Sequence, residues 1–207
     1  MISRKFNSRL PAAVVRTLGS RCLSTGGGKP WISDVAMDTD IVHGGVTPCE
    51  KTGAILTPVF LSTTFVQDSV DTYLDKGFSY SRTANPTVSM LEEKVAKIEN
   101  GYGSICVGTG MSATASCINA FMKTGDHCVI TDCSYGGTNR IMREQFMPLG
   151  MEFSFVDFTD PQNVADAIKP NTKLIFSESP TNPTLKLADL SAISDIAKAN
   201  DILDDED

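Results

Sequence analysis

The sequence predicts an α/β fold in which a mostly parallel sheet carries helices on both of its faces. The first observation is that, from residue 86 onward, short apolar runs alternate with stretches that have a helical period. The second is that loops rich in glycine or proline follow several of the apolar runs. The third is size and composition, because 207 residues with 41% hydrophobic content suffice for a domain with a core.

The first helix is expected to begin at Pro86, with Asn85 as its cap. An asparagine side chain accepts a hydrogen bond from the first helical turn, and proline is favoured at the first helical position. The helix is expected to end at Asn100-Gly101. Its apolar face consists of Val88, Leu91, Val95 and Ile98.

Short strands and helices then follow in alternation. The apolar runs favour buried strands because they are short and lie between turn residues. In the last helical stretch, Leu190, Ile193, Ile196 and Ala197 fall on one face. The expected order is a strand at 104–107, a helix at 112–123, a strand at 127–131, a helix through Arg140 to Phe146, a strand at 151–158, a helix at 161–169, a strand at 173–179 and a helix at 189–198.

Three loops follow the expected strands and are candidates for a binding site. They cover residues 108–111, 132–138 and 179–184. Ligands of parallel sheets lie at the carboxyl ends of the strands. We therefore expect all three loops to line the same edge of the sheet.

Residues 1–28 differ from the rest of the chain. They contain five basic residues, many Ser and Thr, and no acid. Ile2, Phe6, Leu10, Val14 and Leu18 recur every fourth position and would form one apolar face of a helix. This pattern predicts a mitochondrial transit peptide, with a disordered basic tail as the alternative.

Charge and length exclude two classes of partner. Outside residues 1–28, the chain holds 13 basic and 25 acidic residues, a net charge of −12. Such a body repels nucleic acid and anionic membranes. No apolar stretch approaches the length that spans a bilayer, so we expect neither partner.

The six cysteines do not indicate a metal site. The sequence has no C-x-x-C motif, only two histidines and no cluster with zinc-ligand spacing. Cys106, Cys117 and Cys128 lie in apolar runs, which favours buried small side chains and a reducing compartment.

The glycine loop at 108–113 has more than one interpretation. G108-T-G-M-S-A113 matches G-x-G-x-x-A, and Asp132 lies 24 positions beyond Gly108, as in NAD- and FAD-binding oxidoreductases. That fingerprint normally belongs to the first strand of a domain, whereas a long segment precedes it here. A third interpretation is that the glycines only allow close packing of helix and strand.

A different ligand accounts for all three loops. The backbone N–H groups of Gly110 and Met111 at a helix start form a natural phosphate site. Tyr135 offers a flat ring on a loop with neighbouring glycines, and Asn182, between Pro180 and Pro183, can direct its amide at a ring oxygen. A phosphate, a flat ring and a polar ring substituent together describe pyridoxal 5′-phosphate (PLP).

Tyr80 and Arg82 form a further candidate pair. In an extended segment, residues two apart point to the same side, so a hydroxyl and a guanidinium can face one anion. An exposed loop with a surface arginine is the alternative explanation.

Several segments resemble the Cys/Met metabolism family of PLP-dependent enzymes, which includes cystathionine γ-lyases and γ-synthases. The resemblance extends from about residue 38 to 199. It is carried by Y-S-R-T-A-N-P-T, G-T-G-M-S-A, K-T-G-D-H, S-Y-G-G-T-N-R and E-S-P-T-N-P-T-L-K, with I-V-H-G-G (41–45) and P-V-F-L-S-T-T-F (58–65) similar to the family's N-terminal arm. The resemblance implies a fold-type I PLP transferase-like scaffold and a homodimer or homotetramer.

The resemblance also implies how the phosphate is held. The residues that match Tyr80 and Arg82 reach into the neighbouring subunit and grip the phosphate of its cofactor. Those that match Gly110 and Met111 donate backbone N–H groups to the same phosphate. The expected organisation is a transit peptide at 1–28, an arm at 29–86 that contacts the neighbouring subunit, and a partial cofactor-binding domain at 87–207.

For the cofactor ring, the resemblance implies two residues. Tyr135 stacks on the ring and takes part in proton transfer, which makes it the expected catalytic residue, and Asn182 bonds the phenolic oxygen. Thr109 replaces the usual serine, and Gly137 stands where methionine γ-lyases usually have cysteine. The second departure argues against a methionine γ-lyase.

The implied activity is that of a PLP-dependent carbon–sulfur lyase. We expect a cystathionine γ-lyase-like enzyme that expels the γ-thiol of a small sulfur amino acid by γ-elimination. Cystathionine γ-synthase or a related sulfhydrylase of the family is the alternative.

The end of the sequence predicts an incomplete site. The family's Schiff-base lysine and the strand expected after the helix at 189–198 find no match in A-N-D-I-L-D-D-E-D. Lys186 and Lys198 are interpreted as surface charges. We therefore expect a sheet that is incomplete at the C-terminus, and a chain that is inactive alone.

Overall fold

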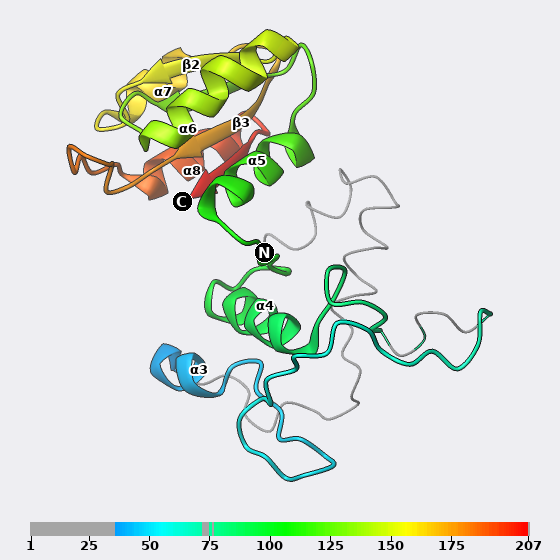
Figure 1. The fold of residues 1–207 in the computed structure, drawn as a ribbon. Coiled ribbons are helices and arrows are strands. Elements are labelled where there is room, and N and C mark those ends of the chain that lie inside the picture. The colour runs from blue at the N-terminus through cyan, green and yellow to red at the C-terminus, as the bar shows by residue number, and fades with distance from the viewer. Residues whose placement is uncertain (1–35, 72–74, 76, 207) are drawn as a thin grey trace. The chain divides into compact units, whose positions relative to one another are not determined.

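The computed structural model describes residues 36–206 apart from 72–74 and 76 (Figure 1). The expected transit peptide at 1–28 lies outside the described residues. The chain divides into two compact units between Cys106 and Val107, and each unit is described by itself. Within the described residues, no helix combines the length and the apolar character needed to cross a bilayer.

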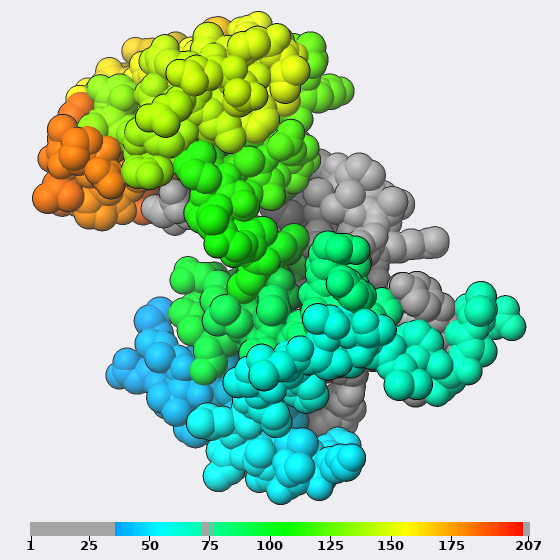
Figure 2. All heavy atoms as spheres, viewed as in Figure 1, coloured from blue at the N-terminus to red at the C-terminus, as the bar shows by residue number. Residues whose placement is uncertain are grey.

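The first unit contains helices α3 (Met37–His43) and α4 (Pro86–Ile98). As predicted, Pro86 opens α4 and Asn85 caps it, because the Asn85 side chain accepts a hydrogen bond of 2.9 Å from the Thr87 N–H. The amide nitrogen of Asn85 also donates to the Phe60 carbonyl at 3.1 Å. The cap therefore joins the start of α4 to the long loop that precedes it, coloured cyan in Figures 1 and 2.

The described part of the first unit has no apolar core of its own. Its buried residues are Gly44, Ser79 and Asn85. The predicted apolar face of α4 is open instead: Val88, Leu91 and Val95 are 40%, 52% and 37% exposed. An amphipathic helix without a covered face needs a partner surface to be stabilised.

The strand predicted at 104–107 does not form. The Ser104 hydroxyl donates to the Glu92 carbonyl at 2.7 Å, and the Cys106 N–H donates to a carboxylate oxygen of Glu92 at 2.9 Å. Glu92 of α4 thus binds the Cys106 N–H, a backbone group that a neighbouring strand would have bonded. Ile105 is 67% exposed, so the apolar run is not buried either.

The second unit is built on a four-stranded sheet in which all pairs are parallel, as predicted. The strands lie in the order β2-β1-β3-β4. They are β1 (His127–Thr131), β2 (Glu152–Val156), β3 (Thr172–Ser177) and β4 (Leu203–Glu206). Its helices are α5 (Gly110–Phe121), α6 (Gly136–Ile141), the π-helical turn η1 (Met142–Phe146), the 3₁₀ turn η2 (Met147–Leu149), α7 (Pro161–Asp166) and α8 (Leu190–Ala199).

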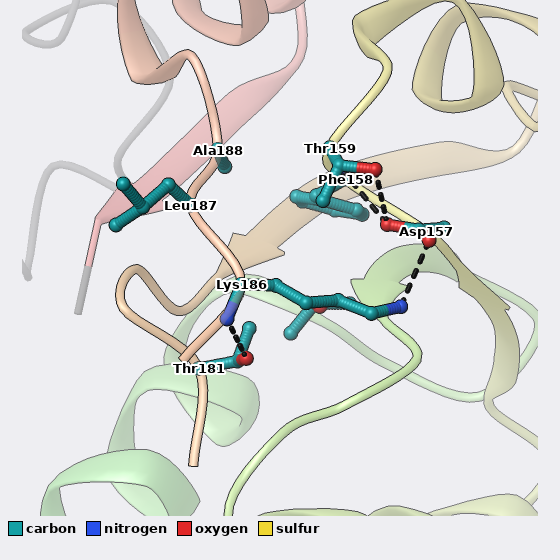
Figure 3. Close-up of a pocket in the computed structure, with 8 residues that line it drawn as sticks. Asp157, Phe158, Thr159, Thr181, Lys186, Leu187 and Ala188 are labelled. Atoms are coloured by element: carbon teal, nitrogen blue, oxygen red, sulfur yellow. Dashed lines mark hydrogen bonds and ion pairs between the residues drawn. The ribbon is translucent and has the colours of Figure 1, made fainter. Parts of the chain in front are cut away.

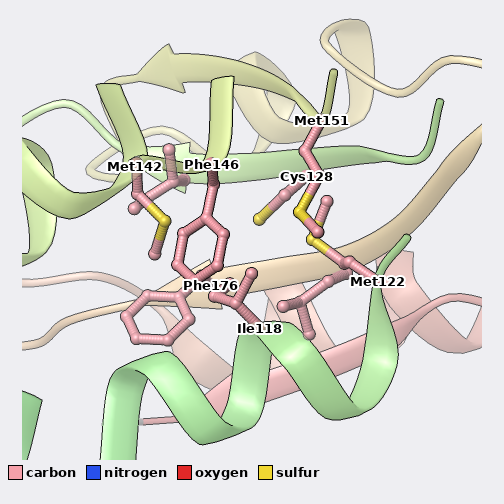
Figure 4. Close-up of a cluster of buried hydrophobic side chains, with 9 residues drawn as sticks. Ile118, Met122, Cys128, Met142, Phe146, Met151 and Phe176 are labelled. Atoms are coloured by element: carbon pink, nitrogen blue, oxygen red, sulfur yellow. The ribbon is translucent and has the colours of Figure 1, made fainter. Parts of the chain in front are cut away.

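The central strands are buried on both faces because their side chains alternate. Cys128 and Ile130 of β1 pack in a cluster with α5, α6 and η1, to which Ile118 and Phe146 contribute (Figure 4). Val129 points the other way. It packs in a second cluster with Val164 of α7 and with Ile193 and Ala197 of α8. Helices therefore cover both faces of the sheet, which confirms the predicted class.

A fourth strand, β4, follows α8 and lies beside β3. The predicted loss of a strand after α8 is wrong, because β4 pairs in parallel with β3 and places Leu203 opposite Leu174. Leu203 packs against the first cluster, and Ile202 packs against the second. Two apolar residues on opposite faces suffice here because the ladder itself consists of backbone hydrogen bonds.

Helix α6 begins earlier than predicted. The sequence suggested a loop through Thr138, whereas the helix starts at Gly136 directly after Tyr135. It then widens into η1, which ends at Phe146 as predicted. Thr138 and Phe146 are buried, so tertiary packing outweighs the low helix propensity of the two glycines.

His127 is fully buried at the start of β1. Its two ring nitrogens lie 2.7 Å from the Thr172 hydroxyl and 2.9 Å from the Ser154 hydroxyl. Burial, assisted by the positive charge of Lys169, lowers the pKa of His127 to about 4, while Glu152 acts in the opposite direction. The imidazole is therefore neutral in the folded chain at pH 7. It joins β1 to both of its neighbours in the sheet, β2 and β3.

Candidate functional site

The sheet reverses its strand order beside β1. The chain leaves β1 to form β2 on one side, and it returns to form β3 on the other. In parallel sheets, the carboxyl ends of such neighbouring strands leave a space in which ligands bind. Two of the three predicted loops meet there, since the Cys133 sulfur lies 3.0 Å from the Thr184 hydroxyl.

The third loop leads into helix α5. Thr109 caps the helix, and its hydroxyl accepts a hydrogen bond of 3.1 Å from the Ser112 N–H. Gly110 and Met111 are the first two helical residues, so their N–H groups have no acceptor within the helix. A Cβ atom built on Gly108 or Gly110 would meet nothing within 4 Å. These N–H groups and the open space beside them fit a phosphate.

Tyr135 and Met111 converge on Gly137. A Cβ atom at Gly137 would lie 2.6 Å from Cε1 of the Tyr135 ring and 2.7 Å from the Met111 sulfur. Any larger residue there must displace one of these side chains. The structure thus brings the Tyr135 loop next to the start of α5, which completes the predicted meeting of three loops. The Tyr135 ring is 51% exposed, so its remaining face is open to a planar ligand.

Asn182 lies on the loop that follows β3. Its side-chain amide has no hydrogen-bonding partner among the residues that the structure describes, and it is exposed. The amide is therefore free to bond a ligand. Four predicted site residues, Gly110, Met111, Tyr135 and Asn182, accordingly belong to the second unit.

Tyr80 and Arg82 belong to the first unit. The prediction of an extended segment is wrong, because residues 81–83 form a turn in which the Tyr80 carbonyl accepts from the Thr83 N–H at 2.9 Å. The two side chains nevertheless meet, since the guanidinium carbon of Arg82 lies 4.9 Å from the centre of the Tyr80 ring. Tyr80 is 40% exposed, and Arg82 is exposed as well, so both can reach an anion outside the chain.

Lys186 is not the isolated surface charge that the sequence suggested. Its ammonium group lies 2.8 Å from an oxygen of Asp157 (Figure 3). It also lies 3.3 Å from an oxygen of Asp132. The hydrogen bond from Lys186 lowers the pKa of Asp157 to about 2, with help from the backbone and hydroxyl of Thr159. The same contacts raise the pKa of Lys186. Lys186 therefore joins the ends of β1 and β2 to the loop after β3.

The small hollow beside Lys186 is not the predicted site. Its walls include Thr131, Phe158 and Leu187, and none of the predicted site residues lines it (Figure 3). The hydroxyl of Thr131 is buried there and has no hydrogen-bonding partner among the residues that the structure describes.

The dinucleotide interpretation of the glycine loop loses its structural basis. The fingerprint requires a strand directly before Gly108, and residues 104–107 form none. The acid that would hold a ribose hydroxyl, Asp132, is engaged by Lys186.

Glu178, which was not among the residues predicted from the sequence, links the Tyr135 and Asn182 loops. One carboxylate oxygen accepts a hydrogen bond from the Tyr135 N–H at 2.8 Å, and the other accepts from the Asn182 N–H at 2.8 Å. An acid directly after a buried strand was the available signal, since such residues are rarely buried without a partner.

A helix start that fits a phosphate, an exposed ring and a free amide at one sheet edge are typical of α/β proteins that bind a phosphorylated planar ligand. Comparison with known families is more specific. The chain belongs to the family of Cys/Met metabolism PLP-dependent enzymes, which matches residues 38–204. The residues at the edge of the sheet fit the cofactor that gives this family its name.

Curated relatives have several activities. A cystathionine γ-lyase of Bacillus subtilis is 43% identical over 165 residues, which are 80% of this chain and 43% of the relative. A cystathionine β-lyase of Coxiella burnetii is 39% identical and covers 81% of this chain and 43% of the relative. A cystathionine γ-synthase of Mycobacterium tuberculosis is 40% identical over 158 residues, which are 76% of this chain and 40% of the relative. The chain spans less than half the length of these relatives.

Solved structures show the same fold. The chain matches metB of Corynebacterium glutamicum with a TM-score of 0.79 and 36% identity, over 84% of this chain and 45% of that one. A cystathionine γ-lyase of Lactobacillus plantarum, solved with L-serine, matches with a TM-score of 0.77 and 34% identity, over 84% and 44%.

Proposed function

We propose that this chain carries part of the active site of a PLP-dependent carbon–sulfur lyase that acts on cystathionine by γ-elimination. The observation that carries the proposal is the convergence of Met111 and Tyr135 on Gly137, beside the open start of α5. The similarity to a γ-lyase over 80% of the chain supports it. A cystathionine γ-synthase is the second candidate, since a γ-synthase shares 40% identity.

Each site residue has a proposed task. The N–H groups of Gly110 and Met111 hold the phosphate, and the Asn182 amide donates to the phenolic oxygen of the ring. Tyr135 stacks on the ring, and its phenol group takes part in proton transfer next to the substrate. When bound, PLP supplies a ring that withdraws electrons from the substrate carbon.

Gly137 supports the preference against methionine γ-lyase. A cysteine at this position would place its Cβ atom 2.6 Å from the Tyr135 ring and 2.7 Å from the Met111 sulfur. The ring would have to move to accept it. The positions of Tyr135 and Met111 are thus matched to glycine.

We further propose that the arm at 29–86 contacts a second copy of the chain, in a homodimer or homotetramer. The described part of the first unit supports this, because it buries no apolar core and leaves one face of α4 open. Tyr80 and Arg82 lie on this arm and have exposed side chains. They would hold the phosphate in the site of the neighbouring copy.

Replacing Gly110 with proline is expected to weaken PLP binding about tenfold, because it removes one N–H donor to a charged phosphate. The helix should persist, since Gly110 is the first residue of α5 and Thr109 already has the extended backbone that precedes proline. PLP binding to wild type and variant is measured by equilibrium dialysis, with NAD⁺ titrated in parallel. Saturable binding of NAD⁺ without binding of PLP would refute the proposed function.

We also propose a mitochondrial location, based on the basic, acid-free character of residues 1–28. A fluorescent protein fused behind these residues is expected to co-localise with a mitochondrial marker. A matched fusion with Arg4, Lys5, Arg9, Arg16 and Arg21 replaced by glutamine should remain diffuse. Diffuse fluorescence of the unaltered fusion would contradict the proposal.

A further inference from the structure

Glu178 is a buried acid at the carboxyl end of β3. It follows Ser177, the last residue of the strand, and its side chain is only 9% exposed. Within the described residues, no lysine or arginine forms an ion pair with it. A buried carboxylate without a cation must be compensated by hydrogen bonds.

Both oxygens of Glu178 are used, and they are used by different loops. Oε2 accepts from the backbone N–H of Tyr135 and Oε1 from the backbone N–H of Asn182, each at 2.8 Å. These donors are 47 positions apart in the sequence. They come from the loops that follow β1 and β3, which are neighbours in the sheet.

Only a carboxylate of this length meets both requirements. Two N–H donors need two acceptors, and an ionised carboxylate accepts on both oxygens. Glutamine has the same shape but offers one oxygen and one NH₂ group, so a donor would face a donor on one side. Aspartate keeps both acceptors but is shorter by one methylene group.

The two loops that Glu178 links carry two of the predicted cofactor-binding residues, Tyr135 and Asn182. Tyr135 is the residue directly before the first turn of α6, and its ring lies against Gly137 in that turn. The position of the Tyr135 backbone therefore determines where its ring lies. Asn182 lies on the other loop with a free amide. A planar ligand that contacts both needs a fixed spacing between them.

We propose that Glu178 is a positioning residue that holds the Tyr135 and Asn182 loops at the spacing required by the cofactor ring. This inference rests on the proposed PLP site. Glu178 acts through the two backbone N–H groups and has no part in the proton transfers.

The test compares Glu178→Gln with wild type in two measurements. The first is hydrogen exchange of backbone amides. The amide of Tyr135 or Asn182 that faces the glutamine NH₂ group is expected to exchange at least about tenfold faster, since it loses a charge-assisted hydrogen bond, while the other amide keeps an oxygen acceptor. The second is the dissociation constant for PLP, which is expected to rise about tenfold. The amides of β1 should keep their protection, because the core is unchanged.

Two further variants make the result specific. Glu152→Gln removes an exposed glutamate that pairs with Lys169, and it should change neither measurement at the site. The amide exchange rates and the dissociation constant for PLP of Glu178→Asp should lie between those of wild type and those of Glu178→Gln. If the glutamine variant does not fold, the aspartate variant decides by the same two measurements.

The outcomes separate this inference from the proposed function. Faster exchange of at least one of the two amides together with weaker PLP binding supports the inference. Unchanged exchange of both amides, or unchanged PLP binding, overturns it while the proposed function stands. Failure of the wild-type chain to bind PLP overturns the proposed function and the positioning role with it.

Discussion

Arg82→Ala is expected to raise the dissociation constant for PLP about 30-fold, which corresponds to about 2 kcal/mol. The guanidinium is exposed and lies 4.9 Å from the Tyr80 ring, where it can form a charge-assisted pair with a phosphate. Equilibrium dialysis against PLP measures the effect. Arg143→Ala serves as a control, because this exposed arginine stacks on Phe155 at 3.8 Å and lies on η1.

Mixing two variants shows whether Arg82 acts on a neighbouring copy. In that arrangement, an Arg82→Ala chain keeps an intact α5 start, and a Gly110→Pro chain keeps its arginine. A mixed dimer then contains one intact site and one that lacks both features. Recovery of wild-type affinity in a fraction of the sites is expected, whereas no recovery on mixing would show that Arg82 acts within its own chain.

Acidification from pH 6.5 to 4 is expected to remove about 3 kcal/mol of folding stability through His127 alone. The pKa of this imidazole is about 4 in the folded chain and about 6.5 when it is unfolded. Between these values, the unfolded chain binds a proton that the folded chain excludes. The free energy of unfolding therefore falls as the pH decreases through this window. Well above pH 6.5 and well below pH 4, the contribution of His127 to that free energy no longer changes with pH.

Urea unfolding at several pH values measures this contribution. Carboxylates also contribute to the pH dependence of stability at low pH. Lys169 lowers the pKa of Glu152 in the folded chain, and Lys186 lowers that of Asp157, so both acids lose stabilising contacts when they are protonated. The pH dependence of His127→Gln is therefore subtracted from that of wild type. Identical slopes for both chains between pH 4 and 6.5 would contradict the prediction.

Local sequence signals predicted most elements because each has a local cause. Asn85, Thr109, Asp160 and Asp189 each cap a helix with their own side chains. The core strands were visible as apolar runs because both faces of a parallel sheet are covered. The run at 104–107 was misleading, since an apolar run forms a strand only where a neighbouring strand can pair with it.

The site was predicted unevenly for a similar reason. Gly110, Met111, Tyr135 and Asn182 could be predicted to lie at one edge of the sheet, because loops at strand ends and helix starts can be recognised from the order of elements. Glu178 was not found, since its role depends on two N–H groups from distant parts of the chain.

By itself, the sequence determined the alternation of strands and helices, the Asn85 cap, and the resemblance that identified the family. These depend on residues close together in the chain or on their order along it. Only the tertiary structure decided that Leu203–Glu206 pair with β3 as a fourth strand, that Lys186 joins two aspartates, and that Glu178 links two loops. Those features are contacts between residues far apart in sequence, and their geometry exists only once the parallel sheet has brought the strand ends together.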